Sequence, residues 1–77
     1  QAILSATTLA QLFGLTPAEA LLASELASGA SLEEAAASLG VSRNTVRSQL
    51  QSVFQKTGTN RQVELVRVLL NSAATAS

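Results

Sequence analysis

Residues 31–57, SLEEAAASLGVSRNTVRSQLQSVFQKT, contain two stretches with helical spacing of apolar residues, separated by a three-residue turn. In residues 32–39 and again in residues 43–57, apolar side chains recur at intervals of three and four positions. These positions are Leu32, Ala35, Ala36 and Leu39, and then Val46, Leu50, Val53 and Phe54. The turn is Gly40-Val41-Ser42, in which Gly40 can adopt the left-handed conformation that ends a helix. The pattern predicts a helix-turn-helix unit, and an ordinary antiparallel helix pair is the alternative.

Polar residues with capping chemistry mark the helix starts along the chain. Two capping boxes are predicted, at Thr16-Pro17-Ala18-Glu19 and at Ser31-Leu32-Glu33-Glu34, and Ser42 can cap a third helix. Thr59-Asn60-Arg61-Gln62 is a further candidate box, with Asn60 as an alternative cap. We expect helices at about residues 17–28, 32–39, 43–57 and 61–74, preceded by a short helix near residues 8–13 that is packed on the domain or leads from another one. No strand-like alternation bounded by turns is present, so we predict an all-α fold.

Composition excludes several classes of function. The 77 residues include no Cys and no His, so disulfides, zinc fingers and His-based catalysis are excluded, and we expect neither a metal site nor a cofactor. No pair of buried carboxylates that could act as acid and base is evident, so catalysis is the least favoured of the functions considered. No apolar run is long enough to span a bilayer and no basic flank of a signal peptide is present, so we expect a cytoplasmic protein with no membrane partner.

The chain opens with Gln1, from which we expect a fragment of a longer protein. Residues 1–14 are expected to form a linker with the short helix, and residues 15–77 the helix-turn-helix domain. A sensor or receiver domain is expected to be covalently linked outside these residues.

Charge is divided unevenly although the formal net charge is zero. Residues 1–40 carry only acidic groups, namely Glu19, Glu25, Glu33 and Glu34. Residues 41–77 carry one acidic group, Glu64, against Arg43, Arg47, Lys56, Arg61 and Arg67. Such polarity predicts a basic face that can meet phosphates, with random segregation in a short chain as the alternative.

Three segments in order, LTPAE at 15–19, AAASLGVSRNTVR at 35–47 and VFQKTGTNRQVELV at 53–66, resemble the LuxR/FixJ/GerE-type DNA-binding domain of bacterial transcriptional regulators. The resemblance covers about Leu15 to Leu70. It implies a four-helix domain whose third helix enters the major groove and whose fourth helix often pairs two subunits. The chain departs from the family pattern at Ala35, where a larger apolar residue is usual, and at Gln49, where His is frequent.

The resemblance assigns base reading to three positions on the third helix, namely Arg47, Ser48 and Gln51. Arg can bond a guanine edge with two hydrogen bonds, and Gln is suited to adenine. Phosphate binding falls on Ser42, Asn44, Thr45, Lys56, Asn60 and Arg61. Ser42 and Asn60 could instead serve only as helix caps, and Ser48 and Gln51 could lie on a solvated helix face.

The fourth predicted helix has more apolar surface than one small core requires. Val63, Val66, Leu70 and Ala73 form one stripe, and Leu65, Val68, Leu69 and Ser72 extend a second. We expect the second stripe to form a homodimer interface, unless both stripes are buried against the N-terminal segment. Pairing is also favoured because so few basic residues predict weak DNA binding by a monomer.

These features together predict sequence-specific binding of double-stranded DNA by the output domain of a bacterial transcriptional regulator. The main alternative is a helical protein-interaction bundle that has helix-turn-helix geometry without binding DNA.

Overall fold

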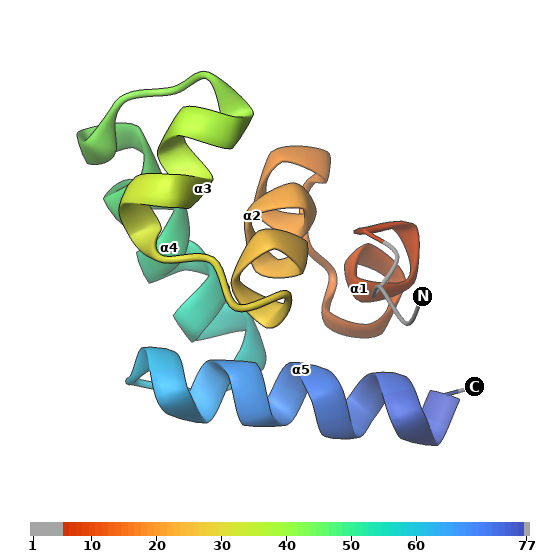
Figure 1. Ribbon diagram of the computed structural model, residues 1–77. Helices are drawn as coiled ribbons and strands as arrows, with labels where there is room; N and C mark the ends of the chain where they lie inside the picture. The colour runs from red at the N-terminus through yellow and green to blue at the C-terminus, as the bar shows by residue number, and fades with distance from the viewer. Residues whose placement is uncertain (1–5, 77) are drawn as a thin grey trace.

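The computed structural model describes residues 6–76, with side chains described as far as Ser72. These residues form five helices, which in chain order are α1 (Ala6–Phe13), α2 (Pro17–Ala27), α3 (Leu32–Leu39), α4 (Arg43–Thr57) and α5 (Gln62–Ala76) (Figure 1). Residues 6–76 contain no strand, which confirms the prediction of an all-α fold. None of these helices has the length and apolar character needed to cross a membrane.

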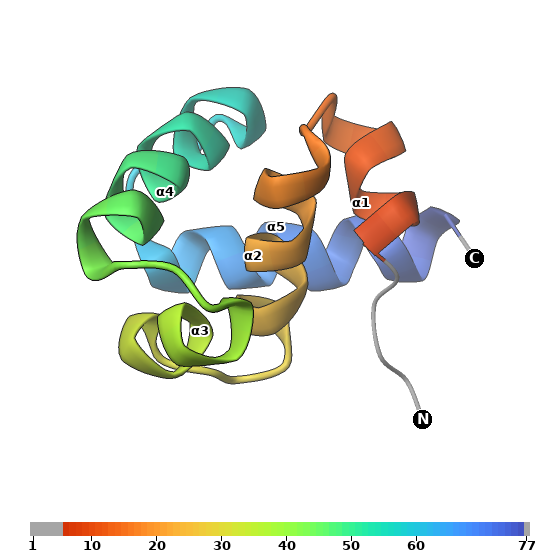
Figure 2. The ribbon, with the colours of Figure 1, turned by 90° about the horizontal axis from the view of Figure 1, so that it is seen from above.

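Helix α2 is the central element of the arrangement and contacts each of the other four helices. Helix α5 crosses beneath α1, α2 and α4, while α3 and α4 with their connecting turn lie at the end of the molecule opposite α1 (Figures 1 and 2). Only the inner side of α4 packs on the rest of the domain, through contacts with α2, α3 and α5. The helix-turn-helix unit is therefore at one end of the molecule, where the outer side of α4 faces solvent.

Helix starts follow the predicted capping chemistry at three of four places. In the box before α2, the Glu19 amide donates a hydrogen bond to Thr16 Oγ1 at 3.2 Å. In the box before α3, the Ser31 amide donates to the Glu34 carboxylate at 2.8 Å. Both boxes are complete and reciprocal. Each such cap contributes about 1 kcal/mol, which matters in a domain of this size.

The fourth predicted start, before α5, is different. Helix α5 begins at Gln62, and the Arg61 carbonyl accepts its first helical hydrogen bond from the Leu65 amide at 2.9 Å. Arg61 is therefore the cap position, and the capping box predicted at Thr59 is wrong. Thr59 is buried instead, and its hydroxyl lies 2.9 Å from the hydroxyl of Thr57. With its hydroxyl at Thr57, the Thr59 side chain faces the end of α4 and does not cap α5.

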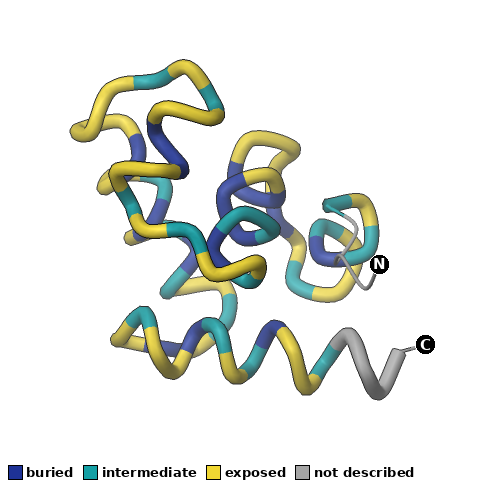
Figure 3. The backbone as a smooth tube through the Cα atoms, in the orientation of Figure 1, coloured by how far each residue is buried: buried dark blue, intermediate teal, exposed yellow. Residues whose placement is uncertain are grey.

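The core is made of aliphatic side chains from all five helices. Figure 3 shows the buried positions along the backbone. Its largest fully buried members are Leu9, Leu22, Leu26, Val46, Val53, Leu65 and Leu69. Leu9 brings α1 into the same core, so the short N-terminal helix is packed on the domain. Ala35 is also fully buried and belongs to the same core cluster.

Candidate nucleic-acid interface

Helix α4 separates apolar and polar side chains onto opposite sides. Val46 and Val53 are fully buried and Leu50 is 8% exposed, so this side packs on the core. The three predicted base-reading residues, Arg47, Ser48 and Gln51, are all exposed. Because positions three and four apart share a helix face, these side chains form one polar surface that points away from the domain. We call Arg47, Ser48 and Gln51 the reading face.

The first turn of α4 carries three of the predicted phosphate-binding residues, all of them exposed: Ser42, Asn44 and Thr45. Ser42 is the N-cap, and its Oγ accepts a hydrogen bond from the Thr45 amide at 3.1 Å. The Ser42 hydroxyl also donates to Thr45 Oγ1 at 3.0 Å. The cap therefore aligns both hydroxyls at the helix start, where the amides without helical partners favour an anion.

Arg43, to which the sequence analysis assigned no role, forms an ion pair with Glu33 of α3. Both side chains are largely exposed, 58% for Arg43 and 70% for Glu33. The pair joins the two helices of the helix-turn-helix unit on its outer side. The sequence could have indicated that Arg43 lies near the reading face, because it precedes Arg47 by one helical turn.

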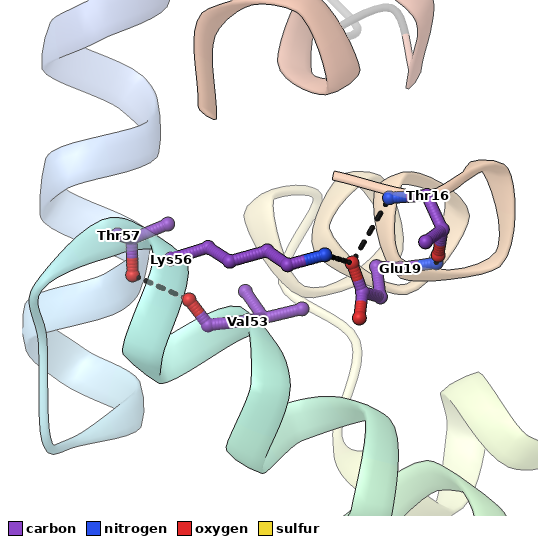
Figure 4. A network of polar contacts seen from close by, with 5 residues as sticks. All are labelled: Thr16, Glu19, Val53, Lys56 and Thr57. Atoms are coloured by element: carbon purple, nitrogen blue, oxygen red, sulfur yellow. Dashed lines mark hydrogen bonds and ion pairs between the residues drawn. The ribbon is translucent and has the colours of Figure 1, made fainter. Parts of the chain in front are cut away.

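Lys56, predicted to bind phosphate, lies on the side of α4 that faces α2. Its Nζ is 2.7 Å from a Glu19 carboxylate oxygen (Figure 4), and the Glu19 side chain is only 10% exposed. The same oxygen accepts a hydrogen bond from the Thr16 amide at 2.9 Å. Hydrogen bonds from Lys56 first, and then from Ser52 and the Thr16 backbone, lower the pKa of Glu19 to about 2. Lys56 thus has a role within the fold, joining α4 to α2.

The C-terminal end of α4 and the turn into α5 form an open groove of about 340 Å³. Its walls are Gln51, Phe54, Gln55, Gly58, Thr59 and Asn60. Gln51 and Asn60, which were predicted for base reading and phosphate binding, therefore lie at the same groove. Gln55 was not predicted; it is exposed and follows Gln51 by one helical turn, a spacing that could have identified it. Arg61, at the cap of α5, is exposed just beyond this groove.

A family model described as bacterial regulatory proteins, luxR family (GerE), matches residues 14–69. This range includes the whole helix-turn-helix unit and most of α5. The chain belongs to the luxR family of bacterial regulatory proteins. A search of curated proteins and a search of solved structures found no match. The match to the family model confirms the resemblance that the three sequence segments indicated.

In this luxR-family domain, α5 faces the core with a side that differs from the predicted one. Leu65 and Leu69, which were predicted at a dimer interface, have no exposed surface because they pack in the core of their own chain. The predicted dimer-interface role is therefore wrong for Leu65 and Leu69. Val68 and Ser72 are partly exposed, whereas the most exposed apolar side chains of the helix are Val63 at 71% and Leu70 at 46%. Ala73 lies beyond the described side chains.

Proposed function

We propose that this luxR-family domain binds double-stranded DNA sequence-specifically, as the output domain of a bacterial transcriptional regulator, with α4 in the major groove. The observation that carries the proposal is the reading face, an exposed strip of Arg47, Ser48 and Gln51 on a helix whose opposite side is buried. An α-helix fits the major groove of B-DNA, and these side chain types form hydrogen bonds with base edges there. The regulator is then cytoplasmic, with a sensor or receiver domain linked to this one.

Phosphate contacts in this proposal come from both ends of the reading face. Ser42, Asn44 and Thr45 lie at the start of α4, and Asn60 and Arg61 lie beside the groove at its end. Contacts on both sides fix the orientation of a helix on the duplex without reading sequence. Lys56 is the weakest member of this set, because its ammonium group already pairs with Glu19.

A homodimer through α5 is part of the proposal, with revised residues. Val63 and Leu70 are seven positions apart and therefore share a helix face, and both are exposed. Val68 and Ser72, from the sequence-based prediction, are partly exposed, but they lie on the other side of α5 from Val63 and Leu70 and are not part of this surface. Two reading faces joined in this way contact two half-sites, which raises the affinity of a domain with few basic residues.

The test is a titration of DNA selected by the chain from a random pool. We expect Arg47→Ala to weaken binding to the selected sequence by about 1 to 3 kcal/mol and to relax the preference at one base pair. Arg61→Ala removes the same charge from an exposed residue proposed to bind phosphate, and it should weaken binding to the selected duplex and to an unrelated duplex alike. If Arg47→Ala also weakened both duplexes equally, base reading by Arg47 would be contradicted. The absence of any salt-dependent DNA binding would favour the alternative, a protein-interaction bundle.

A further inference from the structure

Two basic residues of α4 are paired with carboxylates of neighbouring helices, and the two pairs differ in exposure. Lys56 meets Glu19, whose side chain is 10% exposed and has additional hydrogen-bond donors. Arg43 meets Glu33, whose side chain is 70% exposed, and the Arg43 side chain is 58% exposed. Exposed pairs contribute about 0 to 1 kcal/mol, so the Arg43 guanidinium can exchange its partner at little cost. The Lys56 pair is part of the fold, whereas the Arg43 pair is open to competition.

Arg43 is also in the right place to meet DNA. It is the first residue of α4 and stands between Ser42 and Asn44, both proposed to bind phosphate. Arg47 of the reading face follows one turn later. An Arg side chain forms two parallel hydrogen bonds with a phosphate as readily as with a carboxylate, because both acceptors match its planar donors. A backbone phosphate that approaches Ser42 and Asn44 therefore meets Arg43 together with the Glu33 carboxylate.

We propose that Glu33 is an internal competitor of DNA phosphate for Arg43. In the free domain the carboxylate occupies the guanidinium, and DNA binding replaces it with a phosphate oxygen. The phosphate must displace the carboxylate, so the free energy of the Arg43–Glu33 pair is lost when DNA binds. The pair thus makes Arg43 a conditional phosphate contact and lowers the affinity of a single domain. This inference rests on the proposed function and adds a residue-level control of affinity to it.

The experiment measures the dissociation constant of the 77-residue chain for a fluorescent duplex of the selected sequence over a range of KCl concentrations. We expect Glu33→Gln to bind about twofold to fivefold tighter at 0.1 M salt, which is the range for loss of an exposed ion pair. The slope of log K against log salt should steepen by up to about 0.9, because no carboxylate is left to take up a cation when Arg43 moves to the phosphate. Glu34→Gln is the matched control, since it removes a charge from the next residue while Gln can still complete the capping box with Ser31.

Arg43 is tested by a second pair of variants. Arg43→Gln alone should weaken binding by a smaller factor than the gain from Glu33→Gln, because its cation is already engaged in the parent. Arg43→Gln combined with Glu33→Gln should lose most of that gain. Thermal unfolding by circular dichroism checks that each variant is folded at the titration temperature.

The outcomes separate this inference from the proposed function. If the parent binds the duplex and Glu33→Gln has no larger effect than Glu34→Gln, the competitor role is overturned while the proposed function stands. A gain that persists in the Arg43→Gln background overturns it as well, since the charge of Glu33 would then act without Arg43. If the parent binds no duplex at all, the proposed function fails and this inference fails with it.

Discussion

Glu19 receives hydrogen bonds from two side chains of α4 and from the backbone at the start of its own helix. The Lys56 ammonium group lies 2.7 Å from its carboxylate and the Thr16 amide 2.9 Å from it, and Ser52 adds a further side-chain hydrogen bond. These donors stabilise the ionised carboxylate more than burial destabilises it, which lowers the pKa from 4.5 to about 2. One residue therefore caps α2 and joins α2 to α4.

The first prediction concerns the acid stability that Glu19 supplies. Because the pKa in the folded state is about 2 and the ordinary value is 4.5, the stabilisation is complete above pH 4.5 and is lost as the pH falls toward 2. Glu19→Gln should lower the free energy of unfolding at pH 7 by on the order of 2 kcal/mol, since Gln can still cap α2 but has no charge for Lys56. Urea unfolding at pH 7 and at pH 3 measures both values.

Between these two pH values the parent should lose more stability than Glu19→Gln does. Glu25→Gln makes the same charge change on the same helix and is the control. Equal losses in the parent and in Glu19→Gln would show that the Lys56 pair does not account for the acid sensitivity.

Sequence spacing predicted the exposed residues of the reading face but not this ion pair. Arg47, Ser48 and Gln51 share a face because of the helical repeat alone, so their common exposure could be expected. Glu19 and Lys56 are 37 positions apart, and no local pattern relates them. Their contact depends on how α2 and α4 pack, which is also why Lys56 was expected to be free for phosphate.

At the scale of elements, the turn between α3 and α4 determines where the reading face points. Gly40 has φ of 70° and ends α3, and its amide donates to the carbonyls of the preceding turn. A Cβ at this position would meet no atom within 4 Å, so a substitution is opposed by the backbone conformation and not by crowding. The sequence predicted this left-handed residue and the boundaries of both helices correctly.

A second prediction follows for this turn. Gly40→Ala should lower the free energy of unfolding by about 1 kcal/mol, because a side chain disfavours the left-handed conformation. Gly40→Asn should cost less, since Asn tolerates this conformation better than other residues with a Cβ. Thermal unfolding of the two variants and the parent gives the order. An Ala variant as stable as the parent would mean that the turn can adopt another conformation.

At the scale of the whole molecule, the orientation of α5 decides which apolar residues belong to the core. The helix carries apolar residues on more than one side, and its own sequence does not say which side faces inward. Contacts with α1, α2 and α4 settle the question by burying Leu65 and Leu69. Val63 and Leu70 are left exposed as a consequence.

The third prediction contrasts the two sides of α5. Leu65→Ala should lower the free energy of unfolding by about 2 to 5 kcal/mol, because it leaves a cavity in the core of a small domain. Leu70→Ala, at a side chain that is 46% exposed, should cost far less. Urea unfolding of both variants is the measurement. Similar losses would contradict the orientation of α5 described above.

The fourth prediction addresses the proposed homodimer. Leu70→Glu places a charge on the exposed side of α5 and should weaken binding to DNA with two half-sites by about tenfold or more. Binding to a single half-site should be unchanged, and this duplex is the internal control. Sedimentation that shows one copy of the parent on the two-half-site duplex would contradict pairing through α5.

The sequence by itself determined the helices, their caps at Thr16, Ser31 and Ser42, the turn at Gly40 and the exposed face of α4. These features depend on the helical repeat and on hydrogen bonds between residues three or four positions apart, which a sequence displays directly. Only the tertiary structure decided the inward side of α5, the burial of Thr59 and the pairing of Lys56 with Glu19. Each of these depends on contacts between helices that are distant in the chain, and their relative placement is set by packing of the whole core.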